Sequence, residues 1–198
     1  MTLTRPLILA SGSPRRKQLL EALGLAFDIR VTDVPEVLPE GYDLRNAAHY
    51  LALLKADAAR AWTDNGACVL TADTVVLHEG TLLGKPADHA EALRSLRALQ
   101  AGAHEVVTAF VLQWRNDSGE LQRESVSETA RVYIAPCTDA ELAYYVAHNE
   151  VLDKAGGYGV QDWFGWSKVT RIEGSYANVM GLPTATVWST LLAAGLLK

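Results

Sequence analysis

Two hydrophobic patterns alternate along the chain: short uninterrupted apolar runs, and segments with an apolar residue every three to four positions. Runs bounded by turn residues are typical of buried strands, and the wider spacing is typical of amphipathic helices. The runs predict strands at residues 6–10, 27–31, 68–77, 81–83, 105–114, 121–134 and 168–172. The spacing predicts helices at residues 15–23, 44–62, 86–100, 138–148 and 183–194. This alternation, followed by a long hairpin, predicts a mixed α/β fold.

Local signals mark the ends of several predicted helices. Ser13 is a good N-cap with Pro14 at the first helical position, and Gly24 follows the end of the same helix. Thr138 and Glu141 have the spacing of a capping box. These signals predict where the helices begin and end.

The composition is that of an ordinary globular protein. The 198 residues are 49% hydrophobic and 21% charged, which predicts a single domain over residues 1–198 and excludes general disorder. The net charge of −5 argues against a nucleic-acid polymer as partner but allows a small anionic ligand. Because no apolar run is long enough for a signal peptide or a membrane span, we expect no membrane association and a cytoplasmic protein.

Residues 11–16, Ser-Gly-Ser-Pro-Arg-Arg, connect a predicted buried strand to a predicted helix. Free N–H groups at a helix start, the hydroxyls of Ser11 and Ser13, and the guanidinium groups of Arg15 and Arg16 together suit a phosphate. Arginines in a first turn oppose the helix dipole, which favours an anion that neutralises them. The alternative is a well-capped helix with solvated arginines.

Asp73 interrupts an otherwise apolar predicted strand. Burying an unpaired carboxylate is expensive, so Asp73 should have a cation, a metal or a proton-transfer task; the alternative is a strand-end aspartate that caps a turn. Glu36 and Glu40 lie in an acidic loop and, with Asp73, would suit a hard divalent cation such as Mg²⁺. Most acidic loops, however, are simply solvated.

Lys85 lies in Gly84-Lys85-Pro86, where the preceding glycine spacing is one residue short of a P-loop and Pro86 replaces the magnesium-binding Ser or Thr. The P-loop interpretation therefore fails. Lys85 meets a phosphate, pairs with Asp73, or is a solvated turn lysine.

The glycine-rich segment 153–161 allows a ligand to approach the backbone closely, with Lys154 and Gln161 offering charge and amide groups. Glycine-rich loops are also often just turns. The aromatic segment 162–166 that follows, Asp-Trp-Phe-Gly-Trp, suits stacking on a base or a protein partner, or packing into a lobe.

Taken together, these stretches resemble the Maf family, the septum-formation-associated nucleotide pyrophosphatases. The resemblance covers nearly the whole chain, in order and spacing. Its motifs lie at residues 9–16, 72–76, 84–86, 104–108, 153–156, 174–176 and 181–183.

The resemblance implies an α/β fold with a mixed central sheet flanked by helices and a cleft between two lobes, shared with inosine triphosphatase-like enzymes. It also implies cleavage of a nucleoside triphosphate to the monophosphate and pyrophosphate, dependent on a divalent metal (Mg²⁺ or Mn²⁺), and a homodimer. By the same resemblance, Asp73 is the proton acceptor and Glu36 lines the pocket; from the acidic residues themselves, we expect Glu36 and Asp73 to hold the metal. The residues implied to bind the substrate are Ser11, Ser13, Arg15, Arg16, Lys55, Thr74, Lys85, Lys154 and Gln161.

The Asp-Lys-Ala-Gly-x-Tyr-x-x-Gln form at residues 153–161 is similar to the dTTP/UTP-cleaving branch. Residues 162–166 are bulkier than is usual in the family, and residues 148–152 depart from the common Gly-Glu-Pro. The alternatives are a pyrophosphatase for 7-methyl-GTP or other modified nucleotides, and a nucleotide-binding regulator of septum formation that acts through protein contacts.

Overall fold

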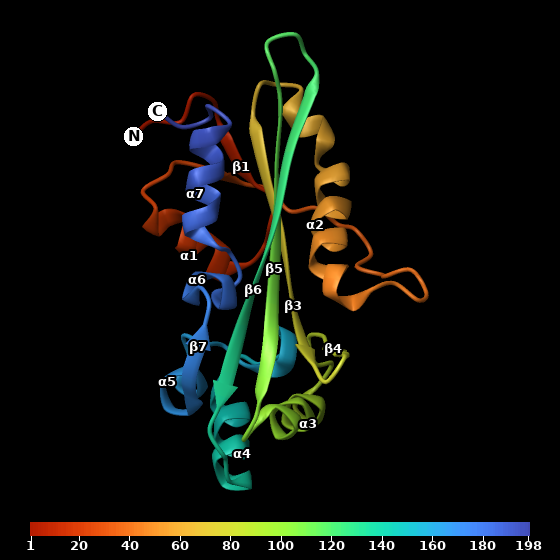
Figure 1. Cartoon of the computed structure of the whole chain (residues 1–198), viewed down its shortest axis with the longest axis vertical. Coiled ribbons are helices and arrows are strands. Elements are labelled where there is room, and N and C mark those ends of the chain that lie inside the picture. Colours follow the sequence, from red (N-terminus) through yellow and green to blue (C-terminus); the bar gives the residue numbers. More distant parts are fainter. The chain divides into compact units, whose positions relative to one another are not determined.

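The computed structural model describes all 198 residues, Met1–Lys198, and consists of two compact units. The first comprises residues 1–73, 108–128 and 181–198, and the second comprises residues 74–107 and 129–180. Each unit is discontinuous because three long strands contribute to both (Figure 1). These strands are β3 (Cys68–His78), β5 (Ala103–Arg115) and β6 (Leu121–Ile134).

The seven-stranded sheet is mixed, as expected. Its order is β2-β1-β3-β5-β6-β7, with β4 paired to β3. The short strands are β1 (Leu7–Leu9), β2 (Asp28–Ile29), β4 (Thr81–Leu83) and β7 (Val169–Glu173). β1 is parallel to β2 and β3, whereas β4 is antiparallel to β3 and β7 is antiparallel to β6.

In the first unit, helices cover both faces of the strands (Figure 1). Leu7 and Leu9 of β1 pack in one core cluster with α1 (Pro14–Ala22) and α7 (Thr184–Ala193). Ile8 points to the opposite face, where it packs with Ala59 after α2 (Ala47–Ala58). The period-two alternation of side chains along a strand explains why a three-residue apolar run is buried on both faces.

The second unit has its own core. Its helices are α3 (His89–Leu99), α4 (Asp139–His148), α5 (Trp163–Lys168) and α6 (Tyr176–Met180), with a 3₁₀ turn at Ala155–Gly157. Leu96, Leu99, Val106, Tyr145 and Phe164 are among its fully buried or nearly fully buried side chains. None of the helices combines the length and the hydropathy that a membrane span requires.

The predicted elements are largely confirmed, with one correction and two omissions. The helix predicted at 44–62 is α2 flanked by 3₁₀ turns at Leu44–Asn46 and Arg60–Thr63, because Asn46 and Ala59 leave helical backbone geometry. The short helices α5 and α6 were not predicted. At six and five residues they are too short to establish a hydrophobic period.

Candidate active site

The start of α1 is built as predicted and also anchors one of its arginines. The Ser13 side chain accepts a hydrogen bond from the Arg16 backbone N–H, and Ser11 Oγ accepts one from the Ser13 N–H at 3.2 Å. The Arg16 side chain donates to Ser11 Oγ at 3.2 Å and to the Gly181 carbonyl at 2.9 Å. Arg16 is therefore held in place, so the solvated-arginine interpretation is wrong for this residue.

The charge of Arg16 lies in a mixed electrostatic environment. Burial lowers its pKa, and neighbouring Arg15 acts in the same direction. Asp73 and Glu36 oppose this effect by stabilising the protonated form. The two predicted carboxylates thus act on the predicted phosphate-binding arginine.

Asp73 lies inside β3 and is only 6% exposed, so it is not a strand-end cap. Its cation partner is Lys55 of α2, which forms an ion pair with it. The same ammonium lies 2.8 Å from Glu36 Oε1, in the loop that precedes α2. Lys55 compensates the buried charge of Asp73 and contacts Glu36 with the same ammonium group, so the two carboxylates lie beside one cation.

These two carboxylates suit a magnesium ion that shares its coordination with phosphate. Magnesium in nucleotide enzymes is usually bound by one or two carboxylates together with substrate phosphates, and not by an all-protein cage. No group of three or more His, Cys, Asp or Glu side chains is arranged to hold a metal ion. Glu40 is exposed in the same loop as Glu36. Glu36 and Asp73 supply oxygen donors of the type that a hard divalent cation prefers, and the Lys55 ammonium contacts both of them.

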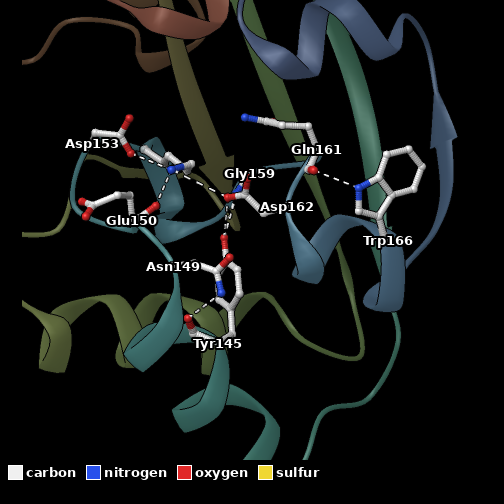
Figure 2. Close-up of polar contacts among 9 residues, drawn as sticks. Tyr145, Asn149, Glu150, Asp153, Gly159, Gln161, Asp162 and Trp166 are labelled. Carbon is white, nitrogen blue, oxygen red and sulfur yellow. Dashed lines mark hydrogen bonds and ion pairs between the residues drawn. The ribbon is translucent and has the colours of Figure 1, made fainter.

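Lys154 is buried, with 6% exposure, in the glycine-rich loop of the second unit. Its ammonium donates to the Glu150 carbonyl and to Asp153 Oδ1 at 2.7 Å, and lies 3.7 Å from Asp162 Oδ2 (Figure 2). Oxygens of Glu150, Asp153 and Asp162 therefore engage this lysine. The sequence indicated a charge for the substrate, and the structure adds a role in holding the loop together.

Gln161 is the last residue of the glycine-rich segment. Its Oε1 is shielded from solvent and has no hydrogen-bond partner. Its backbone carbonyl accepts a hydrogen bond from the Trp166 indole at 2.8 Å, and its side chain extends away from that ring (Figure 2). A buried oxygen without a partner is costly, so this amide suits a ligand that supplies an N–H group.

The other predicted residues of the second unit are Thr74 and Lys85. Thr74 is half-buried and follows Asp73 directly in β3. Lys85 is exposed, and the carbonyl of the preceding Gly84 accepts a hydrogen bond from the Gly156 N–H at 3.0 Å. The backbone thus joins the lysine turn to the glycine-rich loop.

The aromatic segment does not form one exposed patch. Phe164 is fully buried and Trp163 packs against the same core, whereas Trp166 is 76% exposed. Sequence reasoning also missed Tyr145 of α4, whose hydroxyl contacts Asp162 and Gly159. Nothing in the sequence signals these contacts, because an apolar helix face explains a tyrosine equally well.

The sequence matches a known family model over most of its length. The family model described as "Maf-like protein" matches residues 6–194. The chain is 46% identical over 194 residues to the dTTP/UTP pyrophosphatase of Thermus thermophilus, covering 96% of this chain and 95% of the relative. It is 38% identical over 185 residues to the dTTP/UTP pyrophosphatase of Flavobacterium johnsoniae, covering 93% of each chain.

Similarity to solved structures is weaker. A Ham1 protein from Staphylococcus aureus has a TM-score of 0.42 at 13% identity, over 65% of this chain and 72% of that one. A nucleoside-triphosphatase, dITP/XTP pyrophosphatase, from Mycobacterium abscessus has a TM-score of 0.40 at 16% identity, over 96% and 98%. Neither likeness is strong enough to carry a functional assignment.

Proposed function

The chain belongs to the Maf-like family, and from this premise we propose that it hydrolyses dTTP and UTP to the monophosphate and pyrophosphate. The observation that carries the proposal is the buried Asp73 inside an apolar strand, paired with Lys55 and acting electrostatically on the anchored Arg16. Relatives named dTTP/UTP pyrophosphatase, matched over almost their full length, support the substrate class.

In this proposal the start of α1 binds the triphosphate. The helix N-terminus offers partial positive charge, and Arg15 and Arg16 add guanidinium donors. Because Arg16 is already tied to Ser11 and Gly181, little side-chain freedom is lost when phosphate binds. Lys55 and Lys85 would neutralise further phosphate charge.

Hydrolysis needs a base for the attacking water. Asp73 accepts a proton as the water oxygen bonds to the α-phosphorus, and the bond to the pyrophosphate oxygen breaks. Glu36 and Asp73 would hold a divalent cation, Mg²⁺ or Mn²⁺, which when bound supplies charge neutralisation on the phosphoryl oxygens.

Asp73→Asn tests the assignment of the base. The substitution keeps the shape of the side chain but removes the proton acceptor, so kcat for dTTP should fall by about 10²- to 10⁴-fold. Pyrophosphate release is measured with Mg²⁺ or Mn²⁺, and circular dichroism verifies folding. Asp57→Asn, at an exposed ion pair with Arg123, is the matched control and should keep normal turnover. A folded Asp73→Asn protein with near-normal kcat would refute the proposal.

Gln161 is proposed to select the base. Its amide offers both a donor and an acceptor to the O4 and N3–H edge of thymine or uracil, whereas a glutamate at this position only accepts. Gln161→Glu should therefore lower kcat/KM for dTTP and UTP relative to GTP, by roughly tenfold. A panel of canonical and modified triphosphates, including 7-methyl-GTP, measures the change. An unchanged order of preference would contradict this role.

Three further expectations remain proposals: one functional domain over residues 1–198, a homodimer, and a cytoplasmic location. The competing function, a regulator of septum formation acting through protein contacts, draws on the exposed Trp166. Expression of the Asp73→Asn protein in dividing cells separates the two functions. A block in division by the inactive protein would favour the regulator.

A further inference from the structure

Gln161 lies in a turn whose first and last residues are joined by a backbone hydrogen bond. The Asp162 N–H donates to the Gly159 carbonyl at 3.2 Å, so residues 159–162 form a four-residue turn with Gln161 as its third residue. Gly159 has no room for a side chain, since an added Cβ would lie 2.4 Å from Asp162 Oδ2. The turn is therefore compact.

A tyrosine from a different element braces the same turn. The Tyr145 hydroxyl donates to Asp162 Oδ2 at 3.1 Å and accepts from the Gly159 N–H at 3.0 Å (Figure 2). One hydroxyl thus joins the first and last residues of the turn. Tyr145 is itself fully buried in α4 and packs on the Phe164 ring, with centroids 5.2 Å apart, so this brace is rigid.

The electrostatics support the direction of these hydrogen bonds. Burial raises the pKa of Tyr145, so the hydroxyl keeps its proton and can donate to Asp162. Lys154, 3.7 Å from Asp162 Oδ2, attracts the same carboxylate. Asp162 is held from two sides.

The remaining freedom of Gln161 is restricted at its own carbonyl. The Trp166 indole N–H donates to this oxygen at 2.8 Å, although the ring is 76% exposed. A tryptophan that is so exposed contributes little to the core, and its indole N–H is used to contact the backbone of Gln161. The Gln161 side chain, whose Oε1 has no hydrogen-bond partner, therefore extends from a backbone that is held both by the turn and by the Trp166 indole.

We propose that Tyr145, Asp162 and Trp166 are positioning residues that hold the Gln161 amide in one orientation and thereby determine how sharply the enzyme discriminates pyrimidine from purine triphosphates. This inference rests on the proposed function. A fixed amide accepts only the base edge that matches it, whereas a loosened amide adapts to several. Base discrimination should fall when either brace is removed.

The test uses Tyr145→Phe and Trp166→Phe, which remove one hydrogen-bonding group each and keep an aromatic ring. Tyr144→Phe in α4 and Trp188→Phe in α7 are the matched controls. Values of kcat and KM are measured for dTTP, UTP, CTP and GTP, together with inhibition by tripolyphosphate, which has no base.

Each brace variant should lower the ratio of kcat/KM for dTTP over GTP by about 3- to 10-fold, the effect of one ordinary hydrogen bond. The change should appear mainly as a higher KM for dTTP, with inhibition by tripolyphosphate unchanged. The controls should keep the wild-type ratio. Trp166→Phe keeps the test open if Tyr145→Phe fails to fold, because the Trp166 ring lies outside the core.

Three results would overturn the inference. An unchanged ratio in folded variants would leave these residues a structural role only, and an equal loss for all nucleotides and tripolyphosphate would do the same. A loss with Trp166→Ala but not with Trp166→Phe would assign the ring to stacking instead of the N–H to positioning. Wild-type protein that cleaves neither dTTP nor UTP would instead refute the proposed function, so the two failures are distinguishable.

Discussion

The buried histidine of β5 makes the stability of this protein depend on pH. His104 is 2% exposed, and its Nε2 lies 2.7 Å from the Tyr158 hydroxyl. Its Nδ1 has no partner. Burial, with a smaller contribution from His78, lowers the pKa of His104 from 6.5 to about 4. The folded protein therefore holds this ring in its neutral form.

The size of the effect follows from the two pKa values. The unfolded chain binds a proton at this position below about pH 6.5, but the folded protein binds one only below about pH 4. The free energy of unfolding therefore falls as the pH drops from about 6.5 to about 4. Above about pH 6.5 the contribution of the neutral His104 to stability is fully present. The shift corresponds to about 3 kcal/mol in full, and to about 2 kcal/mol at pH 5.

His104→Gln tests this reasoning, because an amide can still reach the Tyr158 hydroxyl but does not titrate. Urea unfolding followed by tryptophan fluorescence gives the free energy of unfolding at pH 7.5 and pH 5.0. The variant should be less stable than wild type at pH 7.5, and the difference should shrink by about 2 kcal/mol at pH 5.0.

His89→Gln, at an exposed position on α3, is the control and should retain the pH dependence of wild type. The reasoning is refuted if the difference between His104→Gln and wild type is the same at both pH values.

Two further substitutions test the packing around the site. Gly165→Ala places a Cβ 1.9 Å from the Val160 carbonyl oxygen, so it should cost more than about 3 kcal/mol or prevent folding; Gly102→Ala, whose Cβ meets nothing closer than 3.7 Å, is the control in thermal melts. Lys55→Met removes the cation from the buried Asp73 and should destabilise the protein by about 3–5 kcal/mol in urea unfolding. Adding Asp73→Asn should restore part of this loss, and strictly additive effects would argue against the ion pair.

Local chemistry explains why much of the fold could be predicted. Ser13 caps α1 and Thr138 forms a capping box with Glu141, and both devices depend on residues three positions apart. The apolar runs of β3 and β5 are long enough to be read as strands by themselves. The short helix α5 escaped prediction because tertiary packing of Phe164 stabilises it, and not a periodic pattern.

In the candidate site, too, some features follow from local sequence and others from tertiary packing. Residue types and their local pattern indicate that Asp73 should have a cation, a metal or a proton-transfer task and that the start of α1 suits an anion, because an aspartate in an apolar run and arginines in a first turn are both costly alone.

Other contacts follow from tertiary packing: Lys55 of α2 supplies the counter-charge of Asp73, and Tyr145 and Trp166 brace the turn that carries Gln161. These partners are chosen by which helix packs beside which strand or loop. Such packing depends on the shape and burial of whole elements, so no local spacing in the chain encodes it.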